Sequence, residues 1–511
     1  MPEYICSFDI GTTGVKAGIL TPDGKLWGTA YQEYGIFFPG PWMVEQSVDE
    51  MWRAQCETSQ RLLKATGINP ADIAGIGISC QRATFIVLGK DMQPLTNFIG
   101  WQDQRSIAQC DQMKDTIGLE HYYRIAGLPL DPIAAVSKIV WLKQNAPEVF
   151  EAAHLFASTQ NVHLYQLGIE DPPCDLPDAA YMGLLDVDNF RWSKELLERL
   201  GIPEEKMPRL VHSGQKVGEV SKAASQATGL AVGTPVVTAG GDLQCAGLGM
   251  GVAESGFVSV GIGTGGDFMI CMDKPRRHPE ISLNCLPHTV AGTWEMEGIT
   301  LASGGAYKWF RDTLGELEKN AASMCGIDPY DILNAKAAIS PPGSNGVLVM
   351  PMLLGAGSPN WYPKARGVML GVSISTSKSD LIRAMLEGIC LELRWVIESA
   401  EKLGTAIEEV RIWGGTAKSR LWNQIAADVY GVPAAKTQVS DAGLVGAAIC
   451  AAVGVGLFNN AREGARAMVH VVERYEPEPV ASARYKELFE IYKEAYKALD
   501  EAGVFERMAA L

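Results

Sequence analysis

One short pattern occurs twice in the chain. Residues 7–19 read S-F-D-I-G-T-T-G-V-K-A-G-I, and residues 257–270 read F-V-S-V-G-I-G-T-G-G-D-F-M-I. Each copy leads from an apolar run through a turn of glycine and threonine into a second apolar run, which is typical of a strand, a tight turn and a return strand. Two copies in one chain predict a duplicated architecture that holds a ligand between the copies.

The first of these turns has the chemistry to hold a metal-bound phosphate. Gly11 and Gly14 let backbone N–H groups and the hydroxyls of Thr12 and Thr13 approach an anion, and Asp9 at the end of the strand is placed to hold a cation beside it. Taken alone, these residues also fit an ordinary β-hairpin, because glycine is common in hairpin turns. The second copy of the pattern favours the phosphate site.

Composition limits the classes of protein to which the chain can belong. Its 511 residues, 47% of them hydrophobic, suffice for more than one domain with sizeable cores. We place the boundary near residue 250, which gives domains at 1–249 and 250–511. The 44 Lys and Arg residues are outnumbered by 59 Asp and Glu, for a formal charge of -15, and this balance opposes a nucleic-acid partner.

Cysteine usage and the apolar segments indicate where the chain works. The 11 cysteines are scattered without a C-x-x-C pair, which indicates a reducing compartment and no structural zinc. The first residues lack the basic and long apolar regions of a signal peptide. The uncharged stretch at 442–458 is rich in Ala and Gly and marginally short for a membrane span, so we expect a closely packed buried helix there. The expected protein is cytoplasmic and has no membrane partner.

Polar side chains follow two predicted strands. The apolar pattern at 73–79 leads to Gln81 and Arg82, and a second apolar segment beginning at Phe98 leads to Trp101 and Asp103. In open α/β sheets, ligands bind at the carboxyl ends of strands. An aromatic ring beside amide, guanidinium and carboxylate groups suits a polyhydroxylated ligand. The alternative is that these are solvated loop residues.

Asp242 is the candidate catalytic acid or base. It follows Gly240 and Gly241 at the end of a predicted strand at 236–239 and precedes a predicted helix at 243–250. An aspartate in this place commonly caps a helix N-terminus. The same carboxylate, in a cleft between domains, is suited to take a proton from a hydroxyl that receives a phosphoryl group. Local sequence leaves both roles open.

Two common nucleotide-binding motifs do not fit the chain. It contains no G-x-x-x-x-G-K-[ST] sequence, so it is not a P-loop enzyme. Gly261, Gly263 and Gly266 match G-x-G-x-x-G, but residues 268–271 predict a return strand where a dinucleotide-binding fold has a helix. The spacing therefore does not indicate a nicotinamide enzyme.

Together, these features resemble the FGGY carbohydrate kinases of the actin and hexokinase superfamily. The family signature fits residues 367–387, G-V-M-L-G-V-S-I-S-T-S-K-S-D-L-I-R-A-M-L-E, and further matches are D-I-G-T-T at 9–13, G-G-D at 240–242, G-T-G at 263–265, W-F-R-D at 309–312 and G-G-x-x-x-S at 414–419. The resemblance spans essentially the whole chain. It implies an α/β fold of two duplicated ribonuclease H-like domains around an ATP-binding cleft, with ATP and Mg²⁺, a small sugar or polyol substrate, and a homo-oligomer of two or four chains.

The resemblance also implies roles for individual residues. Asp242 would be the general base and Asp9 would bind magnesium. The nucleotide and its phosphates would contact Thr12, Thr13, Gly263, Thr264, Gly265, Gly304, Lys308, Gly415 and Ser419. The acceptor would contact Gln81, Arg82, Trp101, Asp103 and Asp242.

The acceptor is the least defined part of this interpretation. C-Q-R-A-T at 80–84 and G-L-P-L-D-P at 127–132 look like glycerol kinases in particular. However, this chain has Ala83 and Ile133 where those enzymes have a Glu and a Tyr that bind hydroxyls, and lost hydrogen bonds to a small triol reduce selectivity for it. We therefore expect phosphorylation of a terminal hydroxyl of an open-chain ketose or polyol, such as the pentulose xylulose. The alternatives are a glycerol kinase and, outside enzymes, an actin-like nucleotide switch.

Overall fold

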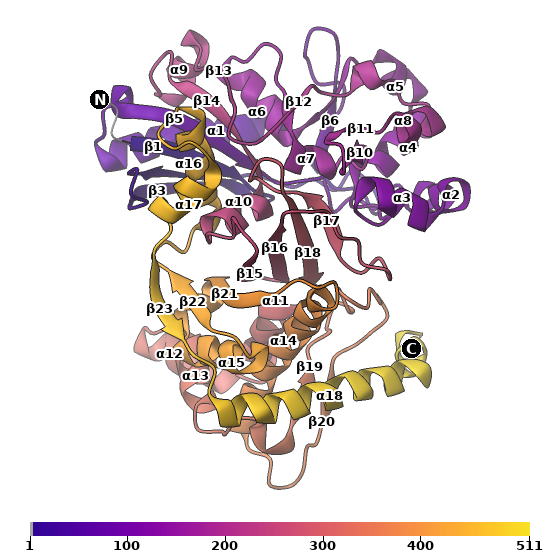
Figure 1. Cartoon of the computed structure of the whole chain (residues 1–511), viewed down its shortest axis with the longest axis vertical. Coiled ribbons are helices and arrows are strands. Elements are labelled where there is room, and N and C mark those ends of the chain that lie inside the picture. The colour runs from indigo at the N-terminus through magenta and orange to yellow at the C-terminus, as the bar shows by residue number, and fades with distance from the viewer. Residues whose placement is uncertain (1–3, 511) are drawn as a thin grey trace.

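The computed structural model describes residues 4–510, which form two α/β halves stacked along the long axis of the molecule (Figure 1). The first half has a six-stranded sheet in the order β13 (Lys216–Glu219), β14 (Pro235–Gly241), β5 (Ile73–Cys80), β1 (Tyr4–Ile10), β2 (Gly14–Leu20), β3 (Leu26–Glu33). The second half has a seven-stranded sheet in the order β17 (Asn284–Pro287), β18 (Trp294–Thr300), β16 (Gly266–Met272), β15 (Gly256–Ile262), β21 (Ile407–Gly414), β22 (Ala434–Thr437), β23 (Val471–Tyr475).

The two sheets repeat one topology. In each, a hairpin pairs antiparallel (β1 with β2, β15 with β16), a further antiparallel strand follows (β3, β18), and the first hairpin strand pairs parallel on its other side (β5, β21). Each sheet then continues with a second parallel strand and ends in an antiparallel edge strand. These are β14 and β13 in the first sheet, and β22 and β23 in the second. Only β17 lies outside this correspondence in the two large sheets described. The predicted duplication is confirmed.

Smaller elements surround the sheets. In the first half they are β4 (Glu45–Gln46), α1 (Val48–Thr66), β6 (Phe85–Leu88), β7 (Phe98–Ile99), α2 (Ile107–Ile117), α3 (Leu119–Ala126), α4 (Ala135–Asn145), α5 (Pro147–Ala152), β8 (Leu155–Ser158), α6 (Thr159–Leu167), β9 (Cys174–Asp175), α7 (Leu176–Ala180), β10 (Leu185–Asp186), β11 (Arg191–Trp192), α8 (Lys194–Leu200), β12 (Leu210–Val211), α9 (Lys222–Thr228) and α10 (Asp242–Gly249). In the second half they are α11 (Ser303–Thr313), α12 (Glu316–Cys325), α13 (Pro329–Ala337), β19 (Leu348–Met350), β20 (Val368–Leu370), α14 (Lys378–Glu401), α15 (Arg420–Tyr430), α16 (Ala442–Gly454), α17 (Ala461–Met468), α18 (Pro479–Glu501) and α19 (Val504–Ala509). Four 3-10 turns lie at 70–72, 204–206, 344–346 and 415–418.

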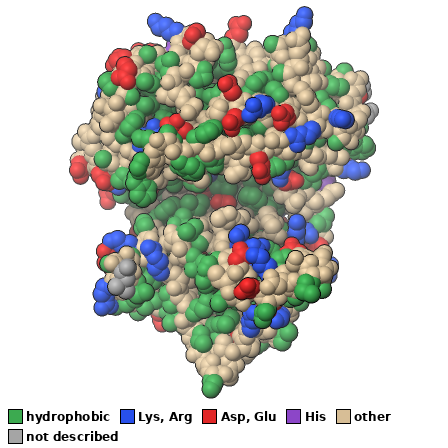
Figure 2. Space-filling view, turned by 180° about the vertical axis from the view of Figure 1, so that it is seen from behind, with side chains coloured by type: hydrophobic (Ala, Val, Ile, Leu, Met, Phe, Trp, Pro, Cys, Tyr) green, Lys and Arg blue, Asp and Glu red, His purple; other side chains and the backbone are tan. Residues whose placement is uncertain are grey.

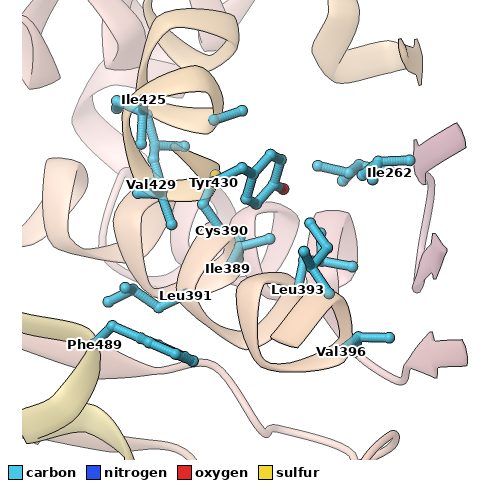
Figure 3. Close-up of a cluster of buried hydrophobic side chains, with 14 of the residues drawn as sticks. Ile262, Ile389, Cys390, Leu391, Leu393, Val396, Ile425, Val429, Tyr430 and Phe489 are labelled. Atoms are coloured by element: carbon cyan, nitrogen blue, oxygen red, sulfur yellow. The ribbon is translucent and has the colours of Figure 1, made fainter. Parts of the chain in front are cut away.

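Helix α14 is the centre of the second half. Its Ile389, Leu393 and Val396 recur at helical spacing and are buried with Ile262 of β15. Figure 3 shows these side chains converging with those of α15, and Phe489 of α18 packing at the other side of the cluster. The core therefore fixes the strand that carries the second glycine-rich turn.

The start of α14 is held by Asp380. Ser377 and Asp380 form a capping box, and the Asp380 carboxylate also accepts hydrogen bonds from Ser340 Oγ and, at 2.8 Å, from Asn345 Nδ2. Burial disfavours the ionised form, but these hydrogen bonds outweigh it and hold the pKa of Asp380 at about 2.

Replacing Asp380 with alanine should lower the free energy of unfolding by about 3 kcal/mol, because a cap is lost and buried donors lose a charged partner. The native pKa lies below the unfolded value of about 3.9, so this stabilisation is present above about pH 4 and is lost as the pH falls toward about 2. Denaturant unfolding over this range measures it. The exposed Asp331 of α13 is the control, since its alanine variant should change the free energy of unfolding by less than about 0.5 kcal/mol. Equal effects of the two variants would show that Asp380 does not stabilise the start of α14.

Helix α16 belongs to the second half by sequence but lies on the first sheet. It packs against β1, β5 and β14, as Figure 1 shows, and also against α10. Its alanines and glycines permit this close approach, so the predicted buried helix is confirmed over 442–454, and residues 455–458 of the predicted stretch lie beyond its end. Within residues 4–510, no helix combines the length and apolar character that crossing a membrane requires.

Candidate active site

A cavity of about 690 Å³ lies between the two halves. Its walls come from both sheets, with Asp9, Arg82 and Asp242 on one side and Asp267, Glu297 and Trp413 among the residues on the other. Figure 2 shows the corresponding hollow at the waist of the molecule, where apolar side chains predominate. The volume is typical of a small-molecule site.

The first glycine-rich turn opens onto this cavity. Strand β1 carries Asp9 near its carboxyl end, the N–H of Gly11 donates to the Gly14 carbonyl at 3.0 Å, and both Asp9 and Thr12 line the cavity. Thr13 is exposed, with its hydroxyl 3.3 Å from that of Tyr31. The predicted strand, turn and return strand are therefore present.

Asp9 is suited to a divalent cation. Burial, and then the nearby carboxylate of Asp242, raise the pKa of Asp9 to about 7, so a cation beside it would relieve an unfavourable charge. Among the residues described, no three Asp, Glu, His or Cys side chains converge as a metal-binding group. Mg²⁺ usually takes one or two carboxylates and completes its shell with water and phosphate, so a single carboxylate such as Asp9 would suffice as its protein ligand.

Asp242 enters the cavity from the start of α10. The residue in the N-cap position is Gly241, and Asp242 is the first residue of the helix. The Asp242 Oδ1 accepts the adjacent N–H of Leu243 at 2.8 Å and lies 3.3 Å from Arg82 Nε. The carboxylate therefore bonds one N–H of the first helical turn and also reaches the cavity. The side chain remains 40% exposed toward the cavity. Burial raises the pKa of Asp242, and the guanidinium of Arg82 opposes this rise.

Arg82 joins the two halves across the cavity. Its Nη1 donates to Glu297 Oε2 at 2.6 Å and its Nη2 to Glu297 Oε1 at 3.3 Å, while its Nε lies 3.3 Å from Asp242 Oδ1. The guanidinium lies over the ring of Tyr181, 4.2 Å from its centroid, and the Tyr181 hydroxyl also donates to Glu297. A side chain at Gly241 would overlap Arg82, so glycine there lets the arginine reach Asp242.

The predicted acceptor residues are only partly brought together. Trp101 lines the cavity and donates from Nε1 to Thr12 Oγ1 at 2.9 Å. Ala83 and Ile133, where hydroxyl-binding side chains are missing, also line it. Trp101 is therefore joined directly to the first turn, and it lines the same cavity as Ala83 and Ile133.

Gln81 and Asp103 do not line the cavity, which corrects the expectation that they contact the acceptor. Gln81 is buried and donates to Gln46 at 2.8 Å, and Gln46 in turn donates to the Thr12 carbonyl at 2.7 Å. Asp103 is fully buried, where it accepts from the N–H of Val44 at 2.6 Å and from the guanidinium of Arg105. Both side chains therefore use their polar atoms to hold neighbouring segments of the cavity wall and do not face the cavity themselves.

Seven of the nine predicted nucleotide residues lie at the edge of the second sheet and, unlike Thr12, are not among the residues that line the cavity. In the turn at 263–265 the N–H of Gly263 donates to the Gly265 carbonyl at 2.9 Å, and the Thr264 carbonyl accepts from Gly305 of α11 at 2.9 Å. A side chain at Gly304 would overlap the Gly263 carbonyl, so the helix and the turn are in close contact. Lys308 lies one turn further along α11 and forms an ion pair with Asp312 at 2.9 Å. Gly415 lies in the 3-10 turn after β21, and Ser419 is the N-cap of α15.

Four of the polar cavity residues that sequence reasoning missed are Tyr181, Asp267, Asn284 and Glu297. Asn284 Nδ2 donates to the Tyr181 hydroxyl at 3.0 Å. A signal was present for two of the four: Asp267 and Glu297 are carboxylates within apolar strand patterns. Tyr181 and Asn284 have no such local signal.

The arrangement is suited to group transfer between two small molecules. From the first sheet, Asp9 and Thr12 of the first turn line the cavity together with the partly exposed carboxylate of Asp242. From the opposite sheet, Asp267, which follows the second glycine-rich turn, lines the same cavity. Phosphoryl transfer requires mainly positioning and charge stabilisation, with one group to accept the proton of the attacking hydroxyl.

Known proteins share the whole architecture. Residues 4–249 match the N-terminal domain and residues 258–455 the C-terminal domain of the FGGY family of carbohydrate kinases. The chain is 32% identical over 503 residues to the glycerol kinase of Trichlorobacter lovleyi, covering 94% of this chain and 97% of that protein, and 27% identical over 495 residues to the xylulose kinase of Bacillus subtilis, covering 97% of each. The structure of ligand-bound xylulose kinase from Lactobacillus acidophilus superposes with a TM-score of 0.90 at 25% identity, covering 99% of both chains. The chain belongs to the FGGY family of carbohydrate kinases and is a phosphotransferase with an alcohol group as acceptor.

Proposed function

We propose that the chain transfers the γ-phosphoryl group of ATP to a terminal hydroxyl of an open-chain ketose or polyol, with a pentulose such as xylulose as the preferred acceptor. The observation that supports this best is the position of Asp242, whose partly exposed carboxylate lines the cavity between the two halves. Thr12 of the first turn and Asp267, which follows the second turn, line the same cavity. From there Asp242 accepts the proton of the attacking hydroxyl while the turns hold the phosphates.

Each predicted residue has a place in this reaction. Mg²⁺ beside Asp9 would neutralise phosphate charge. The phosphates and nucleotide are held by the first turn, the turn at 263–265, and the residues of the second sheet's edge: Thr12, Thr13, Gly263, Thr264, Gly265, Gly304, Lys308, Gly415 and Ser419. Arg82 and Trp101 bind the acceptor, while Gln81 positions Thr12 through Gln46, and Asp103 positions the segment that carries Trp101. We assign acceptor binding mainly to 1–249 and nucleotide binding to 250–511.

The wall at Ala83 and Ile133 supports a longer acceptor than glycerol. Both side chains are apolar and line the cavity, so they leave room and offer no hydrogen bond to a small triol. Glycerol is the second candidate, because the similarity to the glycerol kinase of Trichlorobacter lovleyi is equally strong support.

An ADP-release assay with ATP, Mg²⁺ and a panel of ketoses, polyols and glycerol tests the proposal. The expected result is turnover with a pentulose or related polyol at a kcat/KM at least about tenfold above that with glycerol. Glycerol as the best acceptor would replace the proposal with its second candidate. ADP release that no acceptor accelerates would contradict both.

Location and assembly are further proposals. We propose that the enzyme works in the cytoplasm, a proposal supported by 11 cysteines that are all free thiols. We also propose a homo-oligomer of two or four chains, on the resemblance to the family. Sedimentation velocity of the purified enzyme tests the assembly, and a single monomeric species would contradict it.

A further inference from the structure

One acidic side chain of the cavity has no part in the reaction as proposed. Asp267 is the second residue of β16, directly after the turn at 263–265. Its neighbour Phe268 is fully buried in the core, so the alternation of an extended strand turns Asp267 to the opposite face. There it pairs across the sheet with Ile299 of β18, and both line the cavity.

Asp267 has no partner within residues 4–510. Among the residues described, Arg82 is the cation that lines the cavity, and its N–H groups point to Glu297 and Asp242. No described hydrogen bond or ion pair reaches the Asp267 carboxylate. It also belongs to no group of described side chains that could hold a metal ion. Burial, and then the nearby Glu297 carboxylate, raise the pKa of Asp267 to about 7, as expected where donors are lacking. Asp267 is partly buried and has no donor in the part of the chain that the structure describes, so a ligand that donates a hydrogen bond to it gains free energy.

The net negative charge of the residues that line the cavity also disfavours a negatively charged acceptor. Six lining residues carry carboxylates, namely Asp9, Asp131, Asp242, Asp267, Glu280 and Glu297, against the single guanidinium of Arg82 among the residues described. An acceptor that carries a carboxylate would need a cation, and Arg82 is already paired on two sides. Such an acceptor would have to displace Glu297 or Asp242, or lie next to like charges.

We propose that Asp267 is a specificity-determining residue that binds a hydrogen-bond-donating group of the acceptor, a hydroxyl or an ammonium group, and that excludes acceptors bearing a carboxylate. An ionised carboxylate only accepts hydrogen bonds, so a hydroxyl or an ammonium group satisfies Asp267 whereas the carboxylate group of an aldonate, placed in the same position, does not. This inference rests on the proposed phosphorylation of an open-chain acceptor. It narrows the acceptor to neutral and amino-substituted polyols and ketoses.

Matched acceptors that differ only in one terminal group test the proposal. Gluconate, sorbitol and glucamine share one six-carbon chain and carry a carboxylate, a hydroxymethyl and an aminomethyl group; xylonate, xylitol and 1-amino-1-deoxyxylitol form the same series with five carbons. For each compound, kcat/KM is measured as an acceptor, and the inhibition constant is measured against the best neutral acceptor of the panel. We expect the carboxylate member to be at least about 100-fold weaker than the neutral one, and the amino member to bind at least as well as the neutral one.

Variants of Asp267 assign the effect to this residue. Asp267→Asn keeps the size of the side chain and should reduce discrimination against the carboxylate member at least about tenfold; Asp267→Ala should do the same and also weaken binding of the neutral member. The control is Asp273→Asn, because Asp273 follows the far end of the same strand and forms an exposed ion pair with Arg462 outside the cavity. It should leave discrimination unchanged, and thermal melts verify that all three variants are folded.

The outcomes separate this inference from the proposed function. An enzyme that phosphorylates a neutral polyol but uses or binds the matching carboxylate equally well overturns the role of Asp267 and leaves the kinase assignment intact. If both Asp267 variants discriminate against the carboxylate acceptor as strongly as the parent enzyme does, the proposed role of Asp267 is also overturned. An enzyme that phosphorylates no member of any series contradicts the proposed function itself.

Discussion

Replacing Asp242 with asparagine should lower kcat by about 10³-fold while nucleotide binding is retained. The amide has the size of the carboxylate but cannot accept the proton of the attacking hydroxyl. Asp242 lies on the first half, away from Gly304 and Gly415 at the nucleotide edge, so the affinity for ATP should change little. Steady-state ADP release measures the first quantity and calorimetric titration with ADP the second.

The same carboxylate predicts the acid side of the pH profile. Only the ionised form accepts a proton, so kcat/KM should fall as the pH drops through the pKa of Asp242, which burial raises above the ordinary value of about 3.9. In Asp242→Asn this limb should disappear from the residual activity. Asp273→Asn serves as the matched control for a lost carboxylate. Activity of Asp242→Asn within about tenfold of the parent enzyme would remove the residue from the role of base.

Replacing Gly446 with alanine should lower the free energy of unfolding by about 3 kcal/mol or more. Gly446 lies on α16 where this helix crosses α10, and a side chain there would overlap the backbone carbonyl of Cys245. On the partner helix, a side chain at Gly249 would overlap the carbonyl of Ala442. Because backbone atoms form both contacts, no rotation of a side chain relieves them and the helices have to separate.

Activity should fall with stability in this variant, since α10 begins at Asp242 and Gly443 of α16 lies against Asp9. Denaturant unfolding and ADP release measure the two effects. In the control Gly40→Ala, the new methyl group meets only the flexible Met43 side chain, so little change is expected. A stability of Gly446→Ala within about 0.5 kcal/mol of the parent would show that the crossing tolerates more space than the structure indicates.

Local patterns sufficed to predict the scaffold of the site. The two glycine-rich turns, the strand before Asp242 and the buried helix at 442–454 are each specified by neighbouring residues, through period-two alternation, turn glycines or small-residue content. The duplicated topology follows from finding the hairpin twice. These features depend on short stretches of chain, so sequence alone reveals them.

The chemistry of the cavity depends on contacts that no local pattern contains. Arg82 and Glu297 are 215 residues apart and meet only because the sheets of both halves face the same cavity. Asp103 was expected at the acceptor, yet Val44 and Arg105 hold its carboxylate inside the first half. A sequence identifies which side chains are chemically competent, whereas the tertiary fold decides whether their polar atoms face the ligand or one another.

The position of α16 also has a consequence for the order in which the chain is made. Ile5, Leu20 and Val237 of the first sheet pack with the alanines of α16, which follow β14 by some 200 residues of chain. At a synthesis rate of about 5–20 residues per second, α16 is made roughly 10–40 s after β14, and in this interval the helix does not yet cover this face of the sheet. During that time an apolar sheet surface lacks the helix that covers it, so we expect the first half to complete its fold only after α16 has been synthesised.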